Sequence, residues 1–123
     1  MKKFPINIKR VYDSPSSKDG LRILVDRLWP RGVTKERAHI DYWYKEITPS
    51  PGLRTWFGHK PERFSEFSKL YKDELTQQTE LLEKIKRFSA KQPVTLIYAA
   101  KDPEINHAIV LKEVLDNLTK EGA

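Results

Sequence analysis

The segment from Arg22 to Arg31 combines side chains that bind anions and transfer protons. It reads R-I-L-V-D-R-L-W-P-R: an apolar run typical of a buried strand, followed by an acid, two guanidinium groups and an indole. Pro30 and Gly32 end the strand and turn the chain. Because ligands of open α/β sheets bind at the carboxyl ends of the strands, the residues that follow this strand are predicted to lie at a ligand site.

Two further polar groups follow predicted structural elements and are expected to join the same site. Ser50 and Arg54 follow the third element, and a last group lies where the final strand leads into the final helix. The first turn of a helix offers free N–H groups, and arginine binds phosphate or carboxylate in a bidentate manner. We therefore predict a pocket for a small phosphate- or carboxylate-bearing ligand, with these contacting residues: Asp26, Arg27, Trp29, Arg31, Ser50, Arg54, Tyr98, Lys101, Asp102 and Asn106.

Several of these residues have both a chemical and a structural interpretation. If the protein is an enzyme, Asp26 or Tyr98 would transfer protons while the arginines hold the anion. Lys101 would contact the anion or, if desolvated, act as a base. Alternatively, Asp26 and Arg27 form an internal salt bridge, Tyr98 packs in the core, and Asp102 serves only as a helix cap.

Apolar segments predict the strands that position these groups. Residues 6–12 predict a first strand, the opening segment a second, and the nearly continuous apolar run after Pro93 a central one. The loop over 13–20 is too short for a helical crossover, so the first two strands are either an antiparallel pair or parallel through an irregular link. Residues 39–48 are ambiguous between strand and short helix, and their β-branched and aromatic content favours a strand. These features indicate an α/β domain with a mostly parallel sheet.

Helices are expected in the second half of the chain. Residues 53–57 predict a helical turn, and an apolar stripe over 61–89 predicts one helix, or two helices of about 61–75 and 79–89. The final helix is predicted to begin with Asp102 as its N-cap and Pro103 in its first position.

Composition excludes several classes of protein. The 123 residues hold no cysteine, and five glycines form no G-x-G-x-x-G or Walker loop, so neither a metal nor a common cofactor is predicted. No apolar run is long enough to span a membrane and no secretory signal is present, so a cytoplasmic location is expected. The net charge of +6 favours anionic partners. Nucleic-acid binding is the less favoured alternative because basic and acidic residues are intermixed, and a monomer or a homodimer remains open.

Four motifs together carry a resemblance to a known family. They are K-R-V-Y-D, D-G-L-R-I-L-V-D-R-L-W-P-R-G, T-P-S-P-G-L-R-T-W-F and L-I-Y-A-A-K-D-P-E-I-N-H-A-I-V-L. The chain resembles the YeaO-like branch of the domain-of-unknown-function family 488 over nearly its whole length. The resemblance implies one small three-layer Rossmann-like domain over residues 1–123, and its motif residues add Arg10 and Tyr12 to the predicted ligand contacts.

The resemblance implies no particular reaction. Another branch of the family carries a cysteine after the last core strand and a second in a C-H-R string that opens the last helix. The matching positions here are Tyr98 and Asn106, the latter followed by His107. Cysteine chemistry that belongs to those relatives is therefore not expected in this chain.

Overall fold

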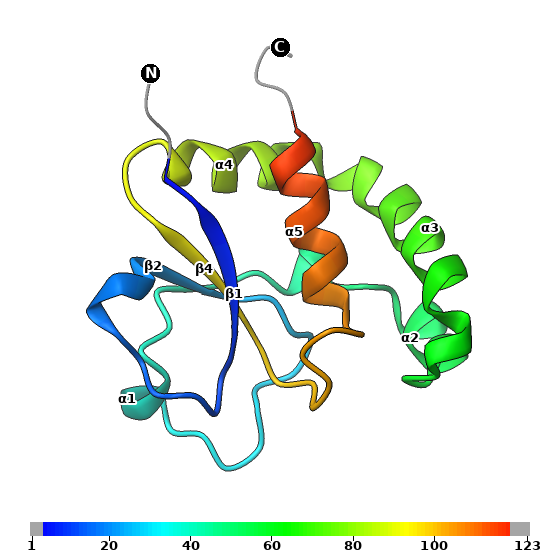
Figure 1. Cartoon of the computed structure of the whole chain (residues 1–123), viewed down its shortest axis with the longest axis horizontal. Coiled ribbons are helices and arrows are strands. Elements are labelled where there is room, and N and C mark those ends of the chain that lie inside the picture. The colour runs from blue at the N-terminus through cyan, green and yellow to red at the C-terminus, as the bar shows by residue number, and fades with distance from the viewer. Residues whose placement is uncertain (1–3, 119–123) are drawn as a thin grey trace.

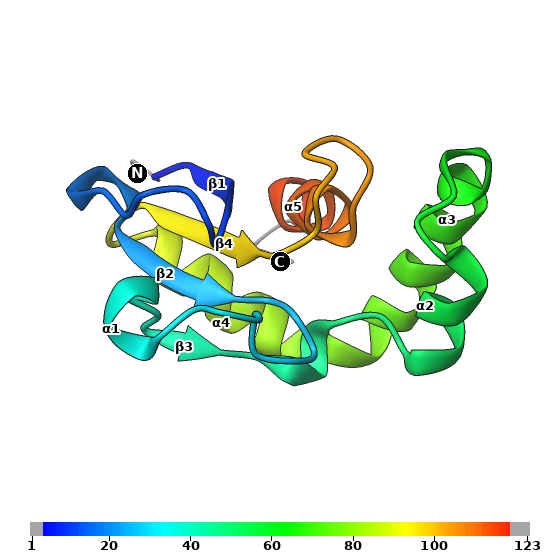
Figure 2. The ribbon, with the colours of Figure 1, turned by 90° about the horizontal axis from the view of Figure 1, so that it is seen from below.

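Four short strands form one sheet in which all neighbouring strands run parallel. A computed structural model describes residues 4–118, with strands β1 (Ile6–Arg10), β2 (Leu21–Leu24), β3 (Tyr42–Trp43) and β4 (Val94–Tyr98). Their order across the sheet is β1-β4-β2-β3, as Figure 2 shows. Every residue of β4 is buried, so the prediction of a central strand from its apolar run is confirmed.

The link between β1 and β2 is irregular, and the two strands are parallel. Residues 11–20 contain only a 3₁₀ turn (Ser17–Asp19), and β4 lies between β1 and β2 in the sheet. The antiparallel alternative is therefore wrong and the irregular parallel link is confirmed. The sequence assumed neighbouring strands, because nothing local signals that a strand more than 70 residues later inserts between them.

Gly20 permits the close approach of β2 to β4. It has a φ of +67°, and a Cβ atom at this position would lie 2.1 Å from the carbonyl oxygen of Pro93. That same oxygen accepts a hydrogen bond from the N–H of Leu21, the first residue of β2. The start of β2 is thus packed directly against backbone, with no room for a side chain.

The described chain also forms α-helices (Figure 1). They are α1 (Lys35–Ala38), α2 (Pro51–Phe57), α3 (Phe64–Leu75), α4 (Thr79–Ser89) and α5 (His107–Asn117). A 3₁₀ turn (Thr76–Gln78) separates α3 from α4, which confirms the two-helix interpretation. No helix within residues 4–118 is both long and apolar enough to cross a membrane.

Two predicted elements differ from the structure. Of residues 39–48, only β3 is a strand, and a 3₁₀ turn follows at Lys45–Ile47. The predicted start of the last helix is wrong: Asn106 is the N-cap, and its Oδ1 accepts the N–H of Ile109. Asp102 instead accepts the N–H groups of Glu104 and Ile105, forming a turn before the helix. Both positions suit the capping chemistry of Asp and Asn, so local sequence alone did not choose between them.

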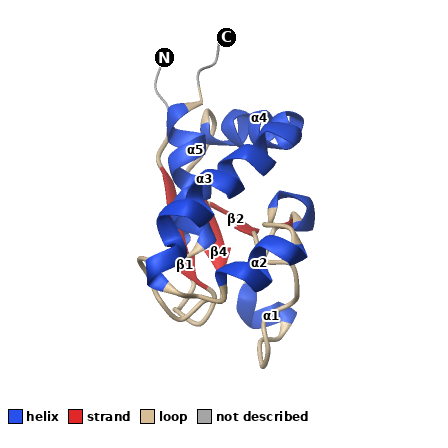
Figure 3. Ribbon diagram, turned by 90° about the vertical axis from the view of Figure 1, so that its right-hand side faces the viewer, coloured by secondary structure: helices blue, strands red, loops and turns tan. Residues whose placement is uncertain are grey.

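The sheet separates two hydrophobic clusters, one on each face. Ile23 and Leu96 point to the face covered by α3, α4 and α5, whereas Leu24 and Ile97 point to the opposite face. There Ala38 of α1 packs together with side chains of the segment 28–43, and α1 lies apart from α3, α4 and α5 (Figure 3). This arrangement agrees with the predicted α/β class and is consistent with a three-layer Rossmann-like fold.

A buried ionic group closes the amino-terminal end of the sheet on the α1 side. Oδ2 of Asp19 lies 2.5 Å from Nη1 of Arg22, and Lys9 Nζ lies 3.0 Å from Oδ1. Arg22 also donates to the carbonyl of Ala38, and Thr95 donates to the carbonyl of Asp19. Burial opposes the charged form of Asp19, but hydrogen bonds from Lys9, the Ser16 N–H and Arg22 outweigh it and lower the pKa of this carboxyl.

We predict that Asp19→Asn destabilises the fold by about 3 kcal/mol near neutral pH, because it leaves the buried Arg22 charge without its partner. The carboxyl has a lower pKa in the folded chain than its ordinary value of 3.8, so its contribution is complete above that value. The contribution is lost as the pH falls through the folded pKa. Urea unfolding of wild type and variant, from neutral pH to about pH 3, measures the difference.

Asp73→Asn on the exposed side of α3 is the matched control, expected to change stability by less than about 0.5 kcal/mol. Equal stabilities of wild type and Asp19→Asn at neutral pH would contradict the assigned role of the buried group.

Candidate functional site

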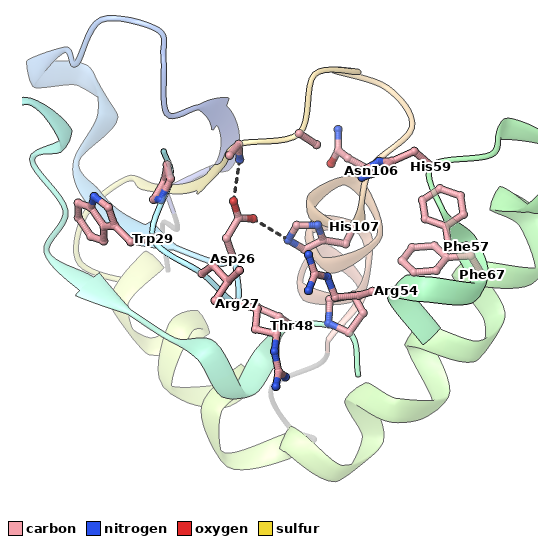
Figure 4. A pocket seen from close by; sticks show the side chains of 15 residues that line it. Asp26, Arg27, Trp29, Thr48, Arg54, Phe57, His59, Phe67, Asn106 and His107 are labelled. Atoms are coloured by element: carbon pink, nitrogen blue, oxygen red, sulfur yellow. Dashed lines mark hydrogen bonds and ion pairs between the residues drawn. The ribbon is translucent and has the colours of Figure 1, made fainter. Parts of the chain in front are cut away.

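A cavity of about 310 Å³, which we call the central cavity, opens at the carboxyl ends of β2 and β4. The segment after β2, the start of α5, and α2 with its flanking residues surround it, as Figure 4 shows. Its polar lining comes from Asp26, Arg27, Thr48, Arg54, His59, Asn106 and His107. Apolar walls are formed by Leu28, Trp29, Pro30, Pro49, Phe57, Phe67, Ala99 and Ala100.

Asp26 connects the strand ends and the helix that border the central cavity. Its Oδ2 accepts the N–H of Ala99 at 2.9 Å, which ties the end of β2 to the end of β4. Its Oδ1 lies 3.2 Å from Nε2 of His107, and its backbone carbonyl accepts the indole N–H of Trp43. The predicted internal pair with Arg27 does not form within the described chain; the partner of Asp26 is His107.

His107 is the first residue of α5 and is largely buried, with 16% of its side chain exposed. Nε2 lies 2.6 Å from the carbonyl oxygen of Val25, in addition to its contact with Asp26. The ring packs edge-on against Tyr71, with 6.3 Å between the centroids. The imidazole is therefore held at one nitrogen by the two residues that follow β2, and its ring contacts α3.

Tyr71 packs against His107 and binds the segment before Thr48. The side chain is fully buried, and its hydroxyl donates to the carbonyl of Ile47 at 2.6 Å. Burial, followed by the nearby Glu74 and Asp26 carboxylates, raises the pKa of this hydroxyl well above 10. Tyr71 is thus a neutral donor that fixes the segment leading to Thr48 against α3.

Arg27 and Arg54 supply positive charge without a protein partner. Both side chains are exposed, and neither forms a hydrogen bond or an ion pair within residues 4–118. The one carboxylate of the cavity lining, that of Asp26, is already engaged by Ala99 and His107. The cavity therefore carries two guanidinium groups that have no direct partner in the described chain.

Five of the predicted site residues line the central cavity: Asp26, Arg27, Trp29, Arg54 and Asn106. Asn106 caps α5, and its Nδ2 donates to the carbonyl of Asp102. Trp29 donates its indole N–H to the carbonyl of Val33 and packs edge-on against Trp43. Both side chains therefore line the cavity and also form hydrogen bonds that stabilise the fold.

Three other predicted residues organise the loops beside the cavity. Arg10 donates through Nε to the carbonyl of Ala100, and its guanidinium lies 5.1 Å from the centre of the Tyr12 ring. The Tyr12 hydroxyl in turn donates to the carbonyl of Arg31. The chain Arg10–Tyr12–Arg31 connects the loops after β1, β2 and β4.

The remaining predicted residues lie away from the cavity lining. Ser50 caps α2 and donates to Glu74 at 2.6 Å. Tyr98 is buried, which raises the pKa of its hydroxyl, while the Arg10 charge acts in the opposite direction. Lys101 and Asp102 are exposed on the loop between β4 and α5.

Sequence reasoning missed His107, together with Thr48 and His59. The three histidines show no spacing typical of metal ligands, so no sequence pattern marks His107 as a site residue. The available signal was position, because His107 directly follows Asn106 at the strand–helix junction already singled out. Within the described chain, no three His, Asp or Glu side chains lie close enough together to hold a metal ion.

Comparison with known proteins assigns the family. Residues 5–123 match the family described as "Inactive DUF488-N3 subclade". The chain belongs to this family. It is 45% identical over 113 residues to the uncharacterised protein YeaO of Escherichia coli K12, an alignment that covers 92% of this chain and 98% of that protein.

More distant relatives occur in mycobacteria. Uncharacterised proteins of Mycobacterium tuberculosis H37Rv and Mycobacterium bovis are each 37% identical over 111 residues, which cover 90% of this chain and 93% of theirs. No solved structure matches the chain. The expected relationship to YeaO-like proteins is confirmed.

We predict that Asp26→Ala lowers stability by about 1–3 kcal/mol, because it leaves the N–H of Ala99 without an acceptor. Amide hydrogen exchange at Ala99 should accelerate more than the loss of global stability explains. Asp13→Ala, which removes an exposed carboxylate before the 3₁₀ turn, serves as the control and should leave this amide unchanged. Unaltered protection of Ala99 in Asp26→Ala would refute the assigned hydrogen bond.

Proposed function

We propose that the protein binds a small anionic ligand, bearing a phosphate or carboxylate group, in the central cavity. The observation that carries this proposal is the presence of two unpaired guanidinium groups, Arg27 and Arg54, on one concave surface. Arginine binds such anions through two parallel hydrogen bonds, and a concave site shields them from water. The start of α5 also borders the cavity, and the positive end of a helix favours the same charge.

The family description supports binding rather than turnover as the role of the site. It characterises the subclade as inactive, and the chain has no cysteine that could serve as a nucleophile. Acid–base catalysis through Asp26 and His107 is the alternative, because the pair resembles a carboxylate that orients an imidazole. A cytoplasmic location, which stays a prediction, would give access to phosphorylated and carboxylated metabolites.

We predict that phosphate, sulfate or small phosphate esters raise the melting temperature of the wild-type protein. Arg54→Gln should weaken their binding about tenfold or more, because a charge-assisted hydrogen bond is lost. Thermal shift and isothermal titration calorimetry against a panel of phosphates and carboxylates measure this effect. The same panel monitored for consumption of ligand tests the catalytic alternative.

Arg87→Gln, on the exposed side of α4, is the matched control and should bind these anions as wild type does. An equal loss in both variants would indicate a general effect of net charge. Absence of any stabilisation of wild type by these anions would refute the proposed function.

We further predict that single- or double-stranded nucleic acid does not displace a bound small anion at physiological salt. Phosphate-backbone binding needs several cations along one surface and weakens steeply with salt. Fluorescence anisotropy with labelled oligonucleotides over a salt series provides the measurement. Tight binding with a steep salt slope, lost in Arg54→Gln, would favour the nucleic-acid alternative.

A further inference from the structure

We propose that the ligand of the central cavity carries a doubly charged oxyanion group, of the phosphate monoester class, and that His107 takes up one proton when this group binds. The inference rests on the proposed function, because it concerns the ligand of the same cavity. It adds a ligand class and a binding residue that sequence analysis did not identify.

The hydrogen bonds of His107 fix its tautomer. Nε2 lies 2.6 Å from the carbonyl oxygen of Val25 and 3.2 Å from a carboxylate oxygen of Asp26. Neither oxygen can donate a hydrogen bond, so Nε2 carries the ring hydrogen of the neutral imidazole. The lone pair therefore resides on Nδ1, which is the atom that accepts a proton when the ring becomes charged.

Nδ1 of His107 is available for this proton. It forms no hydrogen bond within the described chain, and the ring contacts Val25, Asp26 and Tyr71. Among the described residues, the side-chain polar atoms that are both buried and unpaired belong to Arg22 and Tyr44. Nδ1 is not one of them, so it is accessible, and His107 lines the central cavity.

Charged and titratable groups surround His107 on every element packed against the start of α5. They are Asp26 and Arg27 after β2, Arg54 in α2, His59 after α2, Tyr71 in α3, and the exposed Lys101, Asp102 and Glu104 on the loop that enters α5. Tyr71 is neutral because its hydroxyl is fully buried and donates to Ile47. The fixed charges that line the cavity itself are thus those of Asp26, Arg27 and Arg54.

The balance of these charges distinguishes a dianion from a monoanion. While His107 is neutral, the guanidinium groups of Arg27 and Arg54 exceed the Asp26 carboxylate by one charge, which suits a monoanion. A proton on His107 Nδ1 makes an imidazolium whose charge is matched by Asp26, 3.2 Å away. Both guanidinium charges then remain for the ligand, and they match a group with two negative charges.

The size and walls of the cavity favour an ester over free phosphate. A volume of about 310 Å³ is larger than an oxyanion needs, and Leu28, Phe57 and Phe67 contribute apolar surface. Apolar walls with a few placed polar groups are typical of sites for small organic ligands. We therefore infer that the oxyanion group is attached to a small organic part that contacts these side chains.

Sulfate is the chosen probe because it stays doubly charged over the pH range in which histidine titrates. Any proton that is taken up on binding is therefore bound by the protein and not by the ligand. We expect the dissociation constant of sulfate to rise about tenfold between about pH 6 and pH 8.5, because binding takes up a proton. Acetate, a monoanion over the same range, should change about threefold or less. Titration calorimetry in two buffers of different ionisation enthalpy measures the proton uptake directly.

Nitrogen-15 spectra of the histidine rings test the same step without any substitution. In the free wild-type protein at high pH, one histidine should show the Nε2–H tautomer, and saturating sulfate should shift its Nδ1 toward the protonated form. This measurement keeps the inference testable even where a His107 variant does not fold.

His107→Gln should bind sulfate with little dependence on pH, whereas His39→Asn is the matched control. His39 is exposed and does not line the cavity, and asparagine tolerates its positive φ of 50°. Sulfate binding to wild type that does not vary with pH, or a pH dependence that persists in His107→Gln or is lost in His39→Asn, overturns this inference and leaves the proposed function intact. Absence of anion binding at either pH overturns both.

Discussion

The carboxylate of Asp26 is the constraint on which the functional end of the molecule depends. One oxygen accepts the N–H of Ala99 after β4, and the other faces Nε2 of His107 at the start of α5. The backbone carbonyl of the same residue accepts the indole N–H of Trp43 in β3. A single residue thus connects the ends of three strands and the first turn of a helix. Asp26, Ala99 and His107 all line the central cavity.

The carboxylates at the two ends of the sheet have different partners. Around Asp19, the cations Lys9 and Arg22 pair with the carboxylate and close that end. Around Asp26, the carboxylate is satisfied by an N–H group and an imidazole, while the guanidinium of Arg54 stays unpaired. A closed group of charges stabilises the fold, whereas an excess of one sign on a concave surface needs a ligand or solvent to balance it.

Tyr98 and Asn106, the positions at which the resemblance implies cysteines in another branch of the family, have structural roles here. Tyr98 is a buried residue of β4, and Asn106 caps α5 with its side chain. Next to them, Asp26 and His107 meet between the strand ends and the helix.

The sequence by itself determined the elements whose signals are local. The apolar run of β4 and the helical periodicity of residues 61–89 follow from local patterns of apolar residues, whereas the sequence left one helix or two open over 61–89. Only the tertiary structure decided that β4 separates β1 from β2, and that His107 rather than Arg27 pairs with Asp26. Those contacts join residues far apart in the chain, and spacing along a sequence carries no information about which distant partners packing brings together.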